Sequence, residues 1–144
     1  MNWAYIAGLF DGEGCVRVSR SKLGIGITLQ IVQVTQHAAV FYEMATFLKA
    51  LGVEAIVVNE SFLRNPKWKP VSNLTIRRRE SVMAFLRGVL PYLYIKKVSC
   101  QDALRFLRMY PSLKYNRLLM SEAQTRRFAS ERSSRTRRYA LGGA

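Results

Sequence analysis

The chain has 144 residues and a formal net charge of +14, and 49% of its residues are hydrophobic. This length suits one domain with a hydrophobic core, and no apolar run is long enough to span a bilayer. We therefore expect a soluble protein with no membrane partner and no secretory signal. The charge predicts a polyanionic partner, and nucleic acid is favoured because no strongly amphipathic basic helix stands alone at either end.

The two cysteines, Cys15 and Cys100, are isolated and lack the spacing of metal ligands. Reduced thiols in an intracellular protein are the simplest interpretation. We expect a cytoplasmic location, or an organellar one in a eukaryotic host.

Residues 3–14 predict a helix that is apolar almost all round and therefore buried on every face. Ala4, Gly8 and Gly12 recur every fourth residue and form a small-residue stripe, which lets two helix backbones approach closely. Each interior glycine costs about 1 kcal/mol relative to Ala. Asp11 and Glu13 near the end oppose the helix dipole by roughly 0.3–1 kcal/mol. A bound cation would compensate for both costs.

Two strands follow this helix. In residues 15–21 the valines alternate with Arg17, Ser19 and Ser21, which predicts a half-buried strand with these three side chains outward. Residues 25–36 predict a second strand, with Val32 and Val34 inward and Gln33 and Thr35 outward. Earlier in this strand, Ile27, Leu29 and Ile31 occupy the alternate positions that Gln33 occupies later, so one side of the strand would change from apolar to polar. A bulge between the two parts would place all the apolar residues on one face, with Thr28 and Gln30 also outward.

The remaining elements complete an α-β-β-α-β-β-α-α order. Residues 38–51 predict a helix and 53–60 a strand, followed by a basic turn at 65–70. Residues 71–79 predict a strand with Leu74 and Ile76 inward. A helix from about 80 to 89 breaks before Pro91, which opens a last helix running to about residue 110. The fold class is α/β, with helices covering one face of a curved polar sheet. The domain is expected over 1–120, with a basic extension over 121–144.

The run from Ile6 to Gly14 (IAGLFDGEG) resembles the signature motif of the LAGLIDADG homing endonucleases. A second run, Gly88 to Leu93 followed by Lys96 and Lys97, is similar to a later segment of the same family. The resemblance covers roughly residues 3 to 110. It implies the αββαββα fold with a curved antiparallel DNA-binding sheet. It also implies that Glu13, at a position where the family usually has Asp, binds the divalent metals that cleave DNA.

The resemblance implies a homodimer. Of the nine acidic residues, only Asp11 and Glu13 lie among apolar residues and glycines. Two positions apart on a helix, they point about 200° from each other and cannot chelate one ion together. Packing of the small-residue stripe against its own copy would supply a second Glu13. The predicted dimer interface is Ala4, Gly8, Asp11 and Gly12, with Asp11 structural rather than a metal ligand.

The implied activity is site-specific hydrolysis of both strands of a long pseudo-palindromic DNA target, of the intron or intein homing type, leaving short 3′ overhangs. Mg²⁺ or Mn²⁺ would be held by Glu13 and the carbonyl of Gly12, with Ca²⁺ as a non-catalytic substitute. By alignment, Gln36 orders water near the scissile phosphate and Lys96 serves the same water network.

The outward side chains of the strands and turns are the candidates for DNA contact. They are Arg17, Ser19, Ser21, Lys22, Thr28, Gln30, Gln33, Thr35, Lys67, Lys69, Thr75, Arg77 and Arg79. Alternatives remain open. Gln36 and Lys96 could be plain surface residues, the arginines could be solubilising charges, and His37 is favoured as an exposed loop residue. The whole protein could instead be a non-cleaving binder, such as a maturase acting on intron RNA, or a basic ribosomal-type protein.

Overall fold

The computed structural model describes residues 1–21, 24–60 and 69–110. Lys22, Lys67 and the expected 121–144 extension lie outside the described residues, as does the expected domain boundary at 120. The elements run in the order α1 (Trp3–Glu13), β1 (Gly14–Ser21), β2 (Gly24–Val34), η1 (Thr35–His37), α2 (Ala39–Ala50), β3 (Ile56–Glu60), β4 (Val71–Ile76), α3 (Arg79–Val89), η2 (Leu90–Tyr92) and α4 (Lys97–Met109).

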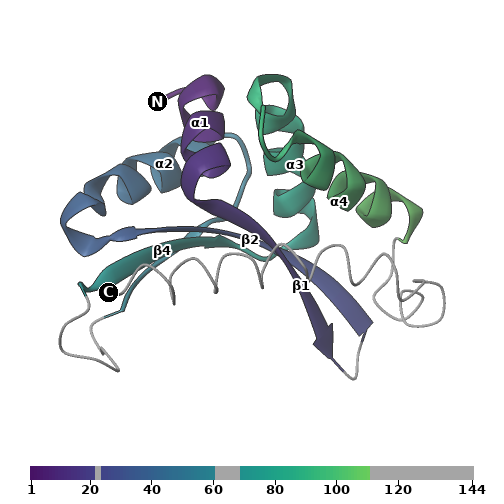
Figure 1. Ribbon diagram of the computed structural model, residues 1–144, viewed down its shortest axis with the longest axis horizontal. Coiled ribbons are helices and arrows are strands. Elements are labelled where there is room, and N and C mark those ends of the chain that lie inside the picture. Colours follow the sequence, from purple (N-terminus) through teal and green to yellow (C-terminus); the bar gives the residue numbers. More distant parts are fainter. Residues whose placement is uncertain (22–23, 61–68, 111–144) are drawn as a thin grey trace, which may run out of the picture.

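Within the described residues, the strands form one four-stranded antiparallel sheet in the order β1-β2-β4-β3. The sheet is curved, and helices α1, α2, α3 and α4 lie on one side of it (Figure 1). This arrangement confirms the predicted α/β class with helices on a single face. We call the side that faces the helices the inner face and the opposite side the outer face. Within the described residues, no helix has the length and hydropathy needed to cross a membrane.

Strand β2 has the same two faces from end to end. Its pairing with β1 and with β4 runs without an extra residue, so the expected bulge is absent. Ile27, Leu29 and Ile31 are buried against the helices, and Thr28 and Gln30 lie on the outer face as predicted. The unbroken alternation places Val32 and Val34 on the outer face and Gln33 on the inner face. The sequence-based assignment of these three residues was therefore wrong.

Strands β3 and β4 are both shorter than predicted. Leu74 and Ile76 are buried, as expected, but β4 ends at Ile76. Arg79, predicted as an outward strand residue, instead opens α3, where its guanidinium donates to the carbonyl of Tyr110 at 2.9 Å. β3 begins at Ile56 rather than at Val53.

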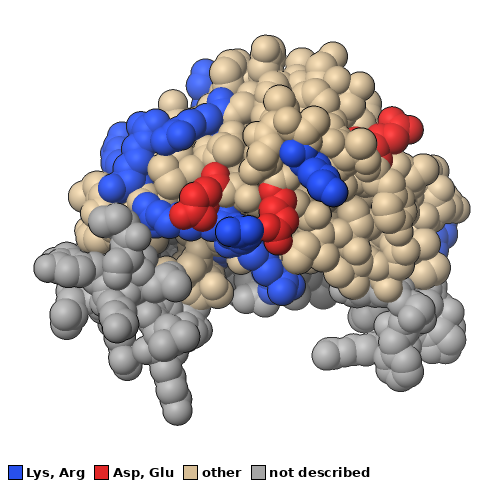
Figure 2. Space-filling model, turned by 180° about the vertical axis from the view of Figure 1, so that it is seen from behind, with Lys and Arg blue, Asp and Glu red and all other residues tan. Residues whose placement is uncertain are grey.

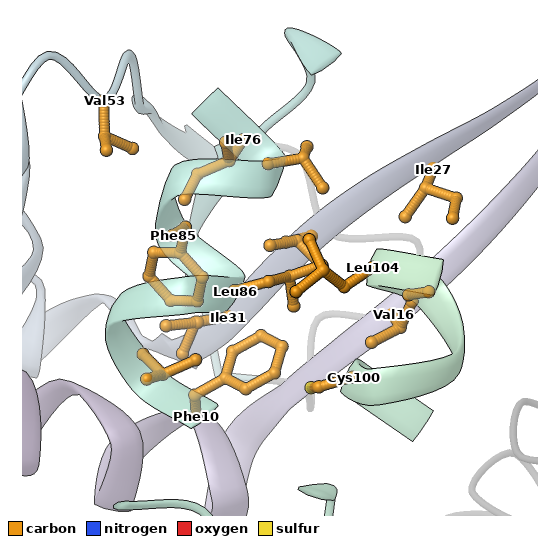
Figure 3. Close-up of a cluster of buried hydrophobic side chains, with 14 of the residues drawn as sticks. Phe10, Val16, Ile27, Ile31, Val53, Ile76, Phe85, Leu86, Cys100 and Leu104 are labelled. Atoms are coloured by element: carbon orange, nitrogen blue, oxygen red, sulfur yellow. The ribbon is translucent and has the colours of Figure 1, made fainter. Parts of the chain in front are cut away.

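The core lies between the sheet and helices α1, α2, α3 and α4. Figure 3 shows Phe10, Ile31, Phe85 and Leu86 lying together in it. Phe85 makes edge-on ring contacts with Phe10, at 5.4 Å between centroids, and with Trp3, at 5.9 Å. Such pairs add about 0.5–1.5 kcal/mol beyond the burial of their area. This packing fixes the orientation of α1 on the sheet.

Gly88→Ala is expected to destabilise the fold by about 1 kcal/mol and by no more than about 2 kcal/mol. A Cβ on Gly88 would lie 2.5 Å from the indole ring of Trp3, so the ring would have to move. Overpacking of this kind costs about 1–3 kcal/mol, which exceeds the gain in helix propensity of about 1 kcal/mol. Urea unfolding followed by fluorescence measures the change. Arg87→Ala on the exposed side of the same helix is the control, and a stabilised Gly88→Ala protein would contradict the packing.

Candidate active site

Helix α1 has one face in the core and one face at the surface. Ile6, Ala7 and Phe10 are fully buried, whereas Ala4, Gly8 and Gly12 are exposed. A Cβ placed on Gly8 or Gly12 would meet no atom within 4 Å. Within this single chain, the prediction of a helix buried on every face is therefore wrong. The small-residue stripe instead forms an open surface.

The C-terminal end of α1 passes into the sheet without a loop. Glu13 is the last helical residue, and Gly14, whose N–H donates to the carbonyl of Phe10, is both the helix cap and the first residue of β1. Gly14 also pairs with Ile31 of β2. In Figure 1, α1 stands between α2 and the α3–α4 pair and continues directly into β1. Glu13 is therefore held at a fixed junction between helix and sheet.

The Glu13 side chain is half-buried. In the described part of the chain, no hydrogen bond or ion pair involves its carboxylate, and no three His, Cys, Asp or Glu side chains gather into a metal-binding group. The main-chain oxygen of Gly12 belongs to the last turn of the same helix, where partial negative charge accumulates. A carboxylate and a carbonyl oxygen are the ligand types that Mg²⁺ and Ca²⁺ prefer. The chemistry of these two groups fits a divalent cation.

The Asp11 carboxylate binds a distant segment of the same chain. It accepts hydrogen bonds from the main-chain N–H groups of Tyr94 at 2.7 Å, Ile95 at 3.2 Å and Lys96 at 2.9 Å. These three amides immediately precede α4, so the last helix begins at Lys97 and not at Pro91 as predicted. The expectation of a structural Asp11 agrees with these bonds. Its predicted role at a dimer interface stays a prediction.

Electrostatics around Asp11 favour its charged form. Partial burial acts to raise the pKa of Asp11, but the amides of Tyr94, Lys96 and Ile95 and the charge of Lys96 outweigh it and lower that pKa below its usual value. The Lys96 ammonium also contacts the main-chain carbonyl oxygen of Asp11. Helix α1 has no basic residue in its last turn, so Lys96, the residue that precedes α4, supplies the positive charge that a helix C-terminus favours.

The structure brings Lys96, but not Gln36, into contact with the end of α1. Gln36 is exposed in η1, and its amide nitrogen lies 3.1 Å from Nε2 of His37, which is also exposed, as predicted. No hydrogen bond joins Gln36 to Glu13 or Lys96 in the part of the chain that is described. These contacts do not test the predicted catalytic roles of Glu13, Gln36 and Lys96.

The outer face of the sheet is polar at one end and more apolar at the other. Around β1, Arg17 donates to the side-chain oxygen of Gln30 at 2.7 Å, and Ser19 donates to the carbonyl of Gly26 at 3.3 Å. Around β3, Ile56 and Val58 are 44% and 46% exposed, next to Thr75 and Asn73 of β4. Sequence reasoning missed these two residues because the faces of their strand could not be assigned without the register.

The other candidates for DNA contact are spread more widely. Ser21 ends β1 opposite Gly24, and Lys69 and Arg77 are exposed outside the strands. Thr35 lies in η1, with its hydroxyl oxygen 3.2 Å from that of Ser72. Figure 2 shows the back of the molecule, where Lys and Arg side chains lie beside Asp and Glu. This side of the described residues therefore carries both signs of charge. Elsewhere among the described residues, Arg78 and Glu54 form an exposed ion pair at 2.8 Å.

A curved antiparallel sheet with helices on one face, entered by a glycine-rich helix ending in a carboxylate, defines a LAGLIDADG-type domain. A sequence profile described as the LAGLIDADG-like domain matches residues 2–89. The chain belongs to this family. A search among curated proteins found no significant match.

Solved structures share the fold at low sequence identity. The homing endonuclease I-CvuI, in complex with its target and Ca, superposes with a TM-score of 0.60 at 21% identity, over 76% of this chain and 67% of that one. The homing endonuclease I-TnaI superposes with a TM-score of 0.59 at 19% identity, over 91% of this chain and 97% of that one. The meganuclease I-AabMI, bound to uncleaved DNA, superposes with a TM-score of 0.56 at 17% identity, over 76% of this chain and 37% of that one. These matches confirm the predicted fold.

Proposed function

We infer that the protein is a site-specific, divalent-metal-dependent DNA endonuclease of the homing type that acts as a homodimer. The observation that carries this proposal is the end of α1. There, a carboxylate without a partner in the described residues lies beside a surface stripe that has no side chains beyond Cβ. Membership of the LAGLIDADG-like family supports the nuclease class. I-CvuI and I-AabMI, whose structures contain DNA, support duplex DNA as the ligand.

The dimer follows from the small-residue stripe. Because Ala4, Gly8 and Gly12 are exposed and leave room, a second copy of α1 could pack closely against the first. A two-fold axis along this contact would bring two Glu13 residues together at the helix ends. The same symmetry would impose a nearly palindromic target, with one sheet on each half-site.

Glu13 and the Gly12 carbonyl are the groups of this chain that would hold the metal, with Mg²⁺ or Mn²⁺ as the ion. Such a cation lowers the pKa of bound water and stabilises developing charge on phosphate. Lys96, fixed to the same helix end, would add positive charge where the phosphate becomes more negative. Gln36 would orient water from η1.

The outer face of the sheet would contact bases and phosphates. Arg17 and Gln30 carry the groups that pair with guanine and adenine edges in the major groove. The exposed Ile56 and Val58 suit contact with thymine methyl groups, so each half-site would be read by both polar and apolar contacts. Lys69 and Arg77 would add phosphate contacts, which set affinity rather than specificity.

Digestion of a randomised duplex library tests the proposal. With Mg²⁺, the purified protein is expected to cut both strands within a few related sequences of approximate two-fold symmetry, leaving short 3′ overhangs. Without divalent metal, the same sequences should be bound but not cut. Sequencing the product ends identifies the sites.

Cleavage without sequence preference, or cleavage that persists without metal, would overturn the proposal. Binding without any cleavage, together with a preference for structured intron RNA, would favour the maturase alternative. An intracellular location belongs to the same proposal, since both substrates are found inside cells.

A further inference from the structure

We propose that Asp11 is a positioning residue that holds Lys96 beside Glu13, so that the two acids of the motif have separate tasks. This inference rests on the proposed nuclease function. It assigns to Asp11 neither a metal nor a partner subunit, but the placement of a cation contributed by a segment more than 80 residues away in sequence.

The carboxylate of Asp11 is already occupied by the main chain. Its Oδ2 accepts from Tyr94 and Ile95, and its Oδ1 accepts from Lys96. Hydrogen bonds from amides to an ionised carboxylate are about twice as strong as those between neutral groups. Both oxygens are therefore committed within one chain, which leaves Glu13 as the acid of this pair that can turn to an ion.

Lys96 is attached to Asp11 at both ends. Its main-chain N–H is bound by the Asp11 carboxylate, and its ammonium group contacts the Asp11 main-chain oxygen. A free lysine side chain samples many rotamers, so attachment at two points reduces this freedom strongly. Although the Asp11 and Glu13 side chains point about 200° apart around the helix, the Lys96 ammonium contacts the main-chain oxygen of Asp11 and is therefore kept at the helix end that also carries Glu13. The arrangement resembles outer groups that orient a catalytic residue and affect rate without touching the substrate.

The test is a double-mutant cycle on single-turnover cleavage of a site selected from the library. Asp11→Asn removes the charge and one of the two acceptor oxygens, and Lys96→Met removes the ammonium group. Asp11→Asn is expected to slow cleavage about 10- to 100-fold with little change in DNA affinity. If Asp11 acts through Lys96, the double variant should cleave no more slowly than Lys96→Met alone. Glu43→Gln, on the exposed surface of α2, is the matched control.

A second pair of variants leaves Asp11 intact, in case Asp11→Asn fails to fold. Tyr94→Pro deletes the N–H that makes the shortest of the three bonds, and the preceding Leu93 already has the extended backbone that proline requires. Tyr94→Ala keeps that N–H, and the Tyr94 side chain is 91% exposed. Slower cleavage by Tyr94→Pro, with wild-type cleavage by Tyr94→Ala, supports the proposal.

Rate losses that multiply in the double variant, or wild-type cleavage by Asp11→Asn, would overturn the positioning role. Amide hydrogen exchange separates this failure from failure of the nuclease function. If the amides of residues 94–96 exchange faster in Asp11→Asn than in the wild type, Asp11 binds this segment, whether or not the protein cleaves DNA. A wild-type protein that retains this protection but cuts no DNA refutes the nuclease function, and with it the assigned role of Lys96.

Discussion

Glu13→Gln is expected to abolish DNA cleavage while leaving DNA binding and folding intact. The amide keeps the size of the side chain but removes the negative charge that would hold a divalent cation. Loss of a group that acts directly on the reaction should lower the single-turnover rate on the order of 10³-fold or more. Because no described hydrogen bond or ion pair depends on this carboxylate, thermal stability should hardly change.

The comparison requires the same DNA site and the same metal concentration for both proteins, with binding measured separately in Ca²⁺ by gel shift. Glu43→Gln again controls for the loss of one negative charge. A Glu13→Gln protein that cuts within a few-fold of the wild-type rate would remove Glu13 from the mechanism.

Gly8→Leu should convert a dimer into a monomer without unfolding the subunit. In the isolated chain, a Cβ at this position meets nothing within 4 Å, and leucine favours helix over glycine by up to about 1 kcal/mol. Between two closely packed α1 helices the same side chain has no room. A penalty of about 3 kcal/mol would weaken the dimer roughly 100-fold.

Light scattering across a concentration series measures the association, and circular dichroism measures the stability of the subunit. Lys49→Leu, which adds an exposed leucine on α2, is the control: it shows whether an added surface leucine changes association when it lies outside the small-residue stripe. If Gly8→Leu still associates as tightly as the wild type, the small-residue stripe is not the contact.

Local patterns in the sequence were sufficient for most of the fold. Hydrophobic periodicity and the positions of glycines predict three features correctly: the helix ending at Glu13, the helix of residues 39–50 and the inward pair Leu74 and Ile76. The two faces of strand β2 were not predicted, because apolar residues occupy both alternating positions at Ile31 and Val32. Only the pairing with β1 and β4 decides which of them faces the helices. The preference of proline for the first turn of a helix predicted a helix start at Pro91. In the structure, the amides of residues 94–96 donate instead to Asp11, which is distant in sequence, and the helix begins at Lys97.

The candidate site was predictable only in part, for a similar reason. The motif predicts roles for Glu13 and Gly12, and the later segment predicts one for Lys96; the structure shows that Lys96 contacts the end of α1, and the roles themselves stay predictions. The partners of Asp11 could not be predicted, since nothing in a carboxylate reveals which amides it will accept from. The apolar residues of β3 on the outer face were equally hidden, because sheet register is a property of paired strands.

The junction at Gly14 has a mechanical consequence. A Cβ there would lie 2.2 Å from the Phe10 ring, and no linker separates α1 from β1, so the helix and the first strand must turn as one rigid piece. In a pair of subunits, the tilt between the two helices would therefore set the tilt between the two sheets. Changes along the helix contact should alter the distance between cuts on opposite strands, while the preferred bases stay the same.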